Sequence, residues 1–145
     1  RSKQLDKFIK QYQKPLLGFC LGMQLLCRHS EESQTQAIGV IDVEVKKFPQ
    51  INSDHAPENA NLKVPHTGWN NLIDTKGKLF QNMHQPDVYF VHSYYVENNH
   101  FTIAQADYVI PLCAAFQKDN FYAVQIHPEK SGDIGLHILK NFLSI

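Results

Sequence analysis

Cysteine and long apolar runs are both scarce in this sequence. Its 145 residues include three cysteines and no Cys-x-x-Cys pair, which disfavours a disulfide framework and a structural zinc site. No apolar run is long enough to span a membrane and no signal-peptide pattern is present, so a cytoplasmic protein is the default expectation. Neither sign of charge is in excess, since 14 basic residues balance 14 acidic ones. That balance gives no electrostatic footprint for nucleic acid or an anionic membrane.

Motifs for metals and cofactors are missing as well. The eight histidines are scattered and form no His-Glu-x-x-His pair, so we expect no metal site. No phosphate-cradling glycine loop occurs, and we expect no cofactor. What is present is 43% hydrophobic residues, enough to bury the core of one domain spanning residues 1–145.

The most informative segment, residues 18–24, reads Gly-Phe-Cys-Leu-Gly-Met-Gln. Residues 15–19 are typical of a short buried strand, and the apolar residues after Gly22 continue as a helix with no turn residue between them. The turn therefore falls on Cys20, and we expect that a side chain at Gly18 or Gly22 would collide across so sharp a bend. A thiol at a helix N-terminus is favoured as thiolate, which makes Cys20 a candidate nucleophile.

A base for this nucleophile is available near the end of the chain. An apolar strand over residues 121–126 leads into His127, Pro128 and Glu129. In extended chain, residues two apart face the same way, so Glu129 can accept one ring N–H of His127 while His127 takes the Cys20 proton. Each residue alone has an ordinary structural explanation, and Cys27 and Cys113 are interpreted as small buried hydrophobes. Together the three fit a nucleophile, a base and an orienting group.

Hydrophobic periodicity predicts the surrounding elements. The closing helix is expected to be capped by Ser131 and to bury a face built from Ile134, Ile138, Leu139 and Phe142. The other predicted elements are a helix over 3–13, strands over 38–48, 88–96, 101–106, 112–116 and 121–126, and a polar loop over 51–62.

The two motifs resemble those of the class I glutamine amidotransferases, whose nucleophile lies in Gly-x-Cys-x-Gly-x-Gln and whose His and Glu lie in a late His-Pro-Glu. The resemblance implies an α/β fold of flavodoxin-like type, with three layers around a central mixed, mainly parallel sheet. It implies that Cys20, His127 and Glu129 hydrolyse glutamine to glutamate and ammonia, with the Leu21 backbone N–H in the oxyanion hole. It further implies that the substrate is bound by Gln24, Ser93 and Tyr94.

Two more segments, residues 65–70 (Pro-His-Thr-Gly-Trp-Asn) and 89–94 (Tyr-Phe-Val-His-Ser-Tyr), resemble one branch of this family. That branch serves imidazole glycerol phosphate synthase in histidine biosynthesis. Its members form a heterodimer with a HisF-type (β/α)₈ cyclase, to which they channel ammonia, and the cyclase yields imidazole glycerol phosphate and an aminoimidazole carboxamide ribotide. The resemblance leads us to expect four residues on the side facing this partner: His66, Trp69, Tyr89 and Lys130.

The sequence departs from this family at its beginning. It opens at Arg1 directly in a predicted helix. The family, in contrast, places strands and a glycine-rich oxyanion segment before the turn that carries the nucleophile. We therefore expect the N-terminal part of the domain to be absent and residues 1–145 alone to be nearly inactive. Two alternatives stay open: a γ-glutamyl hydrolase or peptidase with the same Cys-His-Glu chemistry, and a non-catalytic interaction domain. Turnover of free glutamine and its stimulation by a cyclase would argue against the γ-glutamyl hydrolase. Selective labelling of Cys20 by a glutamine-like electrophile would argue against the interaction domain.

Overall fold

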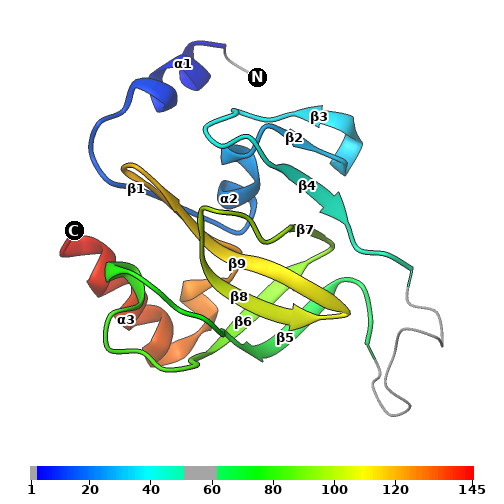
Figure 1. Ribbon diagram of the computed structural model, residues 1–145, viewed down its shortest axis with the longest axis vertical. Coiled ribbons are helices and arrows are strands. Elements are labelled where there is room, and N and C mark those ends of the chain that lie inside the picture. The colour runs from blue at the N-terminus through cyan, green and yellow to red at the C-terminus, as the bar shows by residue number, and fades with distance from the viewer. Residues whose placement is uncertain (1–2, 51–61) are drawn as a thin grey trace.

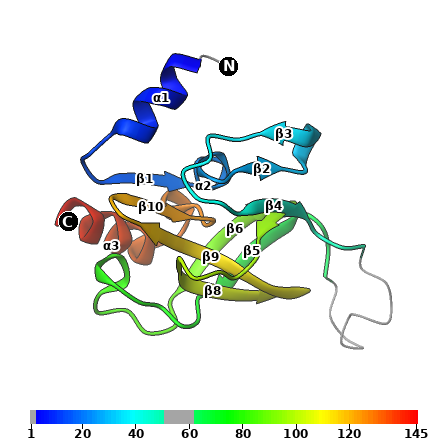
Figure 2. The same cartoon turned by 45° about the horizontal axis from the view of Figure 1, so that its top comes forward.

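The computed structural model describes residues 3–50 and 62–145. Most of the strands in this part of the chain belong to one mixed sheet. The neighbours run in the order β1-β10-β9-β7-β4-β2-β3, and β8 lies off this path and pairs with β9 (Figures 1 and 2). A separate antiparallel pair consists of β5 (His66–Asn71) and β6 (Asp87–His92). The strands of the main sheet are β1 (Leu16–Phe19), β2 (His29–Ser30), β3 (Thr35–Gln36), β4 (Glu44–Lys47), β7 (Tyr94–Val96), β8 (Thr102–Tyr108), β9 (Ile110–Lys118) and β10 (Phe121–Val124).

Helices cover the two faces of this sheet (Figure 2). Helix α2 (Leu21–Leu26) shares one apolar cluster with Phe121 and Ala123 of β10. Helix α3 (Gly132–Leu143) contributes Ile138 to a second cluster, which holds the alternate β10 residues Tyr122 and Val124. This alternation is the period of two that a strand buried on both faces requires. The predicted α/β class with layers on both sides of a sheet is confirmed.

The pairing inside the sheet differs from the prediction in one respect. The sheet is mixed, as predicted, but among the described residues only the pairs β1·β10 and β2·β4 are parallel. The pairs β10·β9, β2·β3, β4·β7, β7·β9 and β8·β9 are antiparallel. Antiparallel neighbours therefore predominate in this part of the chain, because hairpin connections outnumber helical crossovers here.

The first helix, α1 (Lys3–Gln11), forms where the 3–13 periodicity predicts it and stands away from the sheet in Figures 1 and 2. Its apolar residues Leu5 and Phe8 are 56% and 61% exposed. The part of the chain that the structure describes also contains the short 3₁₀ turns η1 (Glu32–Gln34), η2 (Lys78–Phe80) and η3 (Pro128–Lys130). None of the helices within residues 3–50 and 62–145 is long and apolar enough to cross a membrane.

The strand predicted over 38–48 is wrong for its first half, because only Glu44–Lys47 is extended and paired. The backbone N–H groups of residues 38–41 instead bond the free carbonyls at the end of α2. Ile38 donates to the Leu25 carbonyl at 2.8 Å and Val40 to the Leu26 carbonyl at 2.9 Å. The apolar residues of this segment are therefore buried because they cap the C-terminal end of α2. The apolar pattern of the sequence does not distinguish this role from that of a strand.

Three other predictions need correction or fall outside the described residues. The strand predicted over 88–96 is broken at Ser93, so β6 lies in the small sheet and β7 in the large one. Ser131 makes no side-chain cap, because its Oγ donates to the His127 carbonyl at 2.7 Å and accepts from the Tyr89 N–H at 2.9 Å. The polar loop predicted over 51–62 lies almost wholly in residues 51–61, outside the described part of the chain.

Candidate active site

Cys20 lies at the sharp turn between β1 and α2. Its backbone has φ 53° and ψ −113°, a conformation that is strained for a residue with a side chain. Its backbone N–H donates to the Val124 carbonyl of β10 at 2.8 Å, which fixes the turn to the sheet. A cysteine held in a strained strand-to-helix turn is the geometry of a nucleophile elbow.

The two glycines beside Cys20 are not equivalent. A Cβ built at Gly18 would lie 2.8 Å from the backbone carbon and oxygen of Gly22, so Gly18 permits the strand and helix to approach closely. A Cβ built at Gly22 would meet nothing within 4 Å. The predicted collision is therefore present at position 18, and the prediction is wrong for position 22.

His127 and Glu129 reach the same edge of the sheet through β10. Because β1 and β10 are parallel with Phe19 opposite Val124, both strands end at one edge. The His127 Nδ1 lies 2.7 Å from a Glu129 carboxylate oxygen. A carboxylate can only accept, so Nδ1 carries the proton and Nε2 is left free to exchange one. The contact expected between a base and its orienting group is present.

The turn that carries these two residues is anchored on both sides. The His127 backbone N–H donates to the Tyr89 carbonyl of β6 at 2.9 Å. Ser131 Oγ also bridges this turn and β6, through its bonds to the His127 carbonyl and the Tyr89 N–H. On the α3 side, a Cβ at Gly135 would overlap the Pro128 carbonyl oxygen, so η3 and α3 are in direct backbone contact. The position of the ring is thus set by β6 and α3 together.

The charged state of Glu129 is favoured by this contact. Partial burial raises the pKa of its carboxyl, but the hydrogen bond from His127 lowers it, and the net pKa lies below the usual value. The carboxylate is 55% exposed, so solvent screens the interaction and its effect on stability is small. Its effect is on the orientation and tautomer of the His127 ring.

The Cys20 thiol opens onto a cavity of about 370 Å³, within the size range of small-ligand sites. The thiol itself contacts the Val91 carbonyl at 3.7 Å. The lining residues include all three residues expected to bind substrate, Gln24, Ser93 and Tyr94. The remaining lining residues are Leu21, Glu32, Pro65, Val91 and His92.

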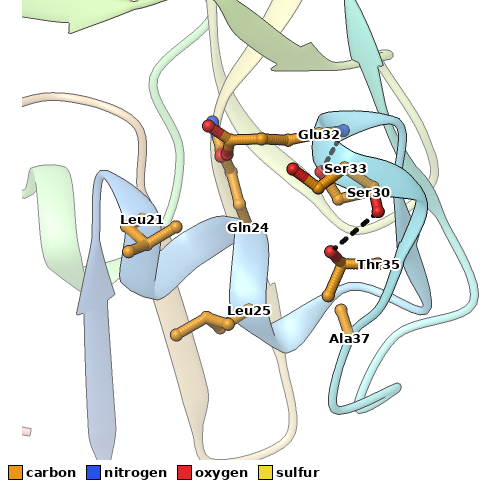
Figure 3. A pocket seen from close by; sticks show the side chains of 8 residues that line it. All are labelled: Leu21, Gln24, Leu25, Ser30, Glu32, Ser33, Thr35 and Ala37. Carbon is orange, nitrogen blue, oxygen red and sulfur yellow. Dashed lines mark hydrogen bonds between the residues drawn. The ribbon is translucent and has the colours of Figure 1, made fainter.

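A second cavity of about 260 Å³ adjoins the first (Figure 3). Leu21, Gln24 and Glu32 line both cavities, so the two form neighbouring compartments on the same side of α2. The second compartment is completed by Leu25, Ser30, Ser33, Thr35 and Ala37.

The sequence predicts a thiolate at position 20, and the structure differs. Burial raises the pKa of the Cys20 thiol above its usual value, the Leu21 backbone N–H opposes that shift, and the Glu129 and Glu32 carboxylates add to it. One helix of six residues does not outweigh partial burial between two acids. The resting thiol is neutral at pH 7 and requires a base to become nucleophilic.

Two of the ionisable residues that line the cavity, Glu32 and His92, were not identified from the sequence. Glu32 reaches the cavity because the chain turns back after α2 through β2, and its carboxylate is close enough to influence the Cys20 pKa. His92 reaches it from the end of β6. Glu32 could not be identified from the sequence, because an acidic residue in a short polar turn has no distinctive pattern. His92 could have been identified, because it lies in the 89–94 segment that resembles the family.

The residues expected on the partner side divide into two groups. Trp69 is 58% exposed, its ring meets the Tyr89 ring edge-on at 5.8 Å, and the Lys130 Nζ lies 5.8 Å from the same Tyr89 ring. We call these three residues the Trp69 cluster. His66 does not belong to it, because its side chain is 2% exposed and contacts His92. The expectation that His66 faces a partner is wrong, since its side of β5 points into the core.

The other two cysteines lie in the core, away from the cavity. Cys27 and Cys113 are buried, and burial raises the pKa of each thiol to about 12. Neither can serve as a nucleophile at neutral pH. Among residues 3–50 and 62–145, no three His, Cys, Asp or Glu side chains are grouped so that they could hold a metal ion.

Comparison with known proteins agrees with the elbow and the fold. The family model for glutamine amidotransferase class-I matches residues 1–145. The fold resembles a putative GMP synthase protein of Thermoplasma acidophilum, with TM-score 0.68 and 20% identity over 97% of this chain and 61% of that one. It also resembles a glutamine amidotransferase of Thermotoga maritima, with TM-score 0.58 and 17% identity over 97% of this chain and 52% of that one. The chain belongs to the class I glutamine amidotransferases.

Curated relatives narrow this family membership. The imidazole glycerol phosphate synthase subunit HisH of Bacteroides fragilis (strain YCH46) is 50% identical over 142 residues, 97% of this chain and 69% of the relative. The same subunit of Escherichia coli (strain K12) is 46% identical over 148 residues, 100% of this chain and 71% of the relative. Within the class, the chain belongs with the HisH subunits of imidazole glycerol phosphate synthase.

Proposed function

We propose that this chain is the glutaminase subunit of an imidazole glycerol phosphate synthase, which hydrolyses glutamine and supplies the ammonia to a HisF-type cyclase subunit for histidine biosynthesis. Its identity to HisH subunits supports the assignment. The observation that carries the chemistry is the His127 to Glu129 contact of 2.7 Å at the edge of the sheet where β1 delivers Cys20.

The first step is formation of a thioester. His127 Nε2 takes the Cys20 proton, and the sulfur attacks the side-chain amide carbon of glutamine. The oxyanion that forms is stabilised by the Leu21 backbone N–H, which already influences the sulfur in the free protein. The carbon–nitrogen bond then breaks while His127 returns the proton to the leaving nitrogen. Ammonia departs and a γ-glutamyl thioester remains on Cys20.

The second step reverses the roles of the same groups. His127 takes a proton from water, and the hydroxide attacks the thioester carbonyl carbon. The carbon–sulfur bond breaks, the thiolate is reprotonated by His127, and glutamate is released. Glu129 stabilises the imidazolium in both steps and keeps its Nδ1 proton in place.

The cavity provides groups for the rest of the substrate. Glutamine carries an α-ammonium group, and Glu32 supplies a carboxylate that faces the cavity. An ion pair between them orients the substrate with its amide toward Cys20. Gln24, Ser93 and Tyr94 complete the wall around the substrate. The cyclase docks over the Trp69 cluster, where the exposed Trp69, the half-buried Tyr89 and one cation gather, a composition common at protein interfaces.

The assignment is tested by measuring glutamate release from glutamine with and without a HisF-type cyclase subunit. The matched part is 69% and 71% of the two HisH relatives, so every activity assay uses a chain that also carries the family's glycine-rich oxyanion segment. We expect hydrolysis that the cyclase stimulates, and synthesis of imidazole glycerol phosphate by the complex. Trp69→Ala should weaken association with the cyclase, while Lys140→Ala on the exposed side of α3 should not. Hydrolysis of γ-glutamyl peptides in preference to glutamine, with no effect of the cyclase, would instead identify a γ-glutamyl hydrolase.

A further inference from the structure

A buried chain of hydrogen bonds joins the β5–β6 pair to the wall of the Cys20 cavity. His66 and His92 are direct partners in the antiparallel register, and the His66 Nδ1 lies 3.0 Å from the His92 Nε2. The other ring nitrogen of His92, Nδ1, lies 2.8 Å from the Tyr94 carbonyl oxygen. The side chains of His66 and His92 are only 2% and 5% exposed. The proposed reaction leaves both rings without a chemical role.

The direction of these bonds follows from the chemistry of the groups. Burial lowers the pKa of His66 to about 3 and that of His92 to about 4, so each ring is neutral and holds one N–H. The Tyr94 carbonyl can only accept, and therefore His92 carries its proton on Nδ1. Its Nε2 must then accept, and the proton between the rings belongs to His66 Nδ1. One arrangement satisfies both contacts: His66 donates to His92, which donates to Tyr94.

This chain of hydrogen bonds ends on the Tyr94 carbonyl, which also binds a side chain of α2. The Gln24 Nε2 donates to the same Tyr94 carbonyl at 3.2 Å and to the Gln125 Oε1 at 3.1 Å. The Tyr94 oxygen thus receives one donor from His92 and one from α2, which uses both of its lone pairs. His92, Tyr94 and Gln24 all line the cavity that contains Cys20. Displacement of this carbonyl would move both the cavity wall and Gln24.

Packing alone does not explain why these positions are histidines. The His66 ring stacks on Phe90 at 4.7 Å and on Tyr108 at 3.7 Å, and His92 lies 5.2 Å from the Phe48 ring. A phenylalanine would fill such an aromatic environment without the cost of burying polar nitrogen atoms. The nitrogens are tolerated because each contact satisfies a donor and an acceptor. Their presence indicates a role for the bonds themselves.

We propose that His66 and His92 are positioning residues for glutamine binding, which hold the Tyr94 carbonyl and through it Gln24 at the cavity wall. This inference rests on the proposed glutaminase function. These hydrogen bonds connect the β5–β6 pair, which carries Trp69 and Tyr89, to the wall of the substrate cavity. The connection is separate from the hydrogen bond between Tyr89 and His127.

The first test separates the hydrogen bonds from the packing. His66→Phe and His92→Phe keep a ring in the core but remove the donors, and we expect the KM for glutamine to rise roughly fivefold to a hundredfold while kcat changes by less than about threefold. His66→Asn should restore much of the KM, because its amide nitrogen can occupy the place of Nδ1. Phe48→Leu is the packing control, since it disturbs the neighbour of His92 without removing a bond of the chain. It should lower stability and leave the KM unchanged.

The second test observes the tautomers directly, by ¹⁵N NMR of the imidazole rings in the wild-type chain. We expect both rings to be neutral with the proton on Nδ1 from about pH 5 to pH 8. A proton on Nε2 of His92 would overturn the chain of bonds, and this measurement decides the matter even where a phenylalanine variant fails to fold.

The outcomes also distinguish this inference from the proposed function. If the wild type hydrolyses glutamine and the folded phenylalanine variants keep its KM, the inference is wrong and the function stands. A rise in KM for Phe48→Leu as large as that for the phenylalanine variants would mean a general structural role. Absence of glutamine turnover in the wild type and its cyclase complex, measured in a chain that carries the oxyanion segment, would remove the function, and the positioning role with it.

Discussion

The backbone N–H of His127 donates a hydrogen bond to the Tyr89 carbonyl across 2.9 Å, which ties the proposed catalytic base to strand β6. The Val91 carbonyl, two residues further along the same strand, accepts from the Cys20 thiol at 3.7 Å. One strand therefore contacts both the base and the nucleophile, although they lie more than a hundred residues apart in the chain. Because β6 also belongs to the pair that carries Trp69, a partner bound there can act on both groups.

Replacement of Cys20 by Ala should abolish glutamine hydrolysis, since no other group can form the thioester. We expect a loss of at least about a thousandfold in kcat, measured as glutamate release. Ammonia-dependent synthesis by the complex with the cyclase should persist, because that reaction does not use the thiol. The matched control is Cys27→Ala, which removes a buried thiol and should retain turnover. Loss of both activities in Cys20→Ala would indicate a folding role for this residue.

The rate of Cys20 alkylation by a small neutral electrophile should still be increasing at pH 9. Burial and two carboxylates raise the thiol pKa above its usual value, so the reactive thiolate accumulates only as the pH rises through that higher value. Cys27 and Cys113, with a pKa of about 12 each and buried side chains, should react far more slowly in the folded chain. The measurement is peptide mass spectrometry over a pH series. A rate that is already constant below pH 7 would mean a resting thiolate.

Glu129→Gln should lower kcat roughly tenfold to a thousandfold with little change in the KM for glutamine. The amide can no longer stabilise the imidazolium, and it can present the wrong group to Nδ1. Stability should change little, because the carboxylate is 55% exposed. Asp133→Asn, an acid-to-amide change in the first turn of α3, provides the control. Equal kcat values in the two variants would remove Glu129 from the mechanism.

The two glycines of the elbow should respond differently to alanine. Gly18→Ala places a methyl group 2.8 Å from the Gly22 backbone, where no flexible side chain can yield, and we expect about 1–3 kcal/mol of destabilisation with loss of turnover. Gly22→Ala meets open space inside a helix and should be neutral or slightly stabilising. Thermal unfolding and glutaminase assays of both variants check this. A larger effect at position 22 than at position 18 would contradict the geometry of the turn.

Much of the site could be predicted from the sequence, because its chemistry is encoded in two short local motifs. Gly18 is demanded by the close approach of β1 to α2, and Pro128, between His127 and Glu129, begins the 3₁₀ turn η3. The position of Glu32 could not be predicted, since it depends on how the chain folds back over α2. The burial of His66 depends on its register with His92, a contact 26 residues away that no local pattern records.

The fold shows the same limit. The strand predicted over 88–96 is rich in β-branched and aromatic residues, and yet it divides at Ser93 between two sheets. The division is stabilised by His92, whose ring bonds the Tyr94 carbonyl across the break. Likewise, residues 38–41 look like a strand because they are apolar, but their N–H groups serve the end of α2. The hydrophobic pattern of a sequence indicates which residues are buried. It does not indicate which groups form hydrogen bonds with the backbone N–H and C=O of those residues.

The most direct test of the central claim is covalent labelling with a diazoketone analogue of glutamine, followed by mass spectrometry of the intact and digested chain. We expect a single adduct on Cys20, protection by excess glutamine, and much slower labelling in His127→Ala. A folded chain that gains no adduct on Cys20, or that is labelled equally at Cys27 or Cys113, would contradict it.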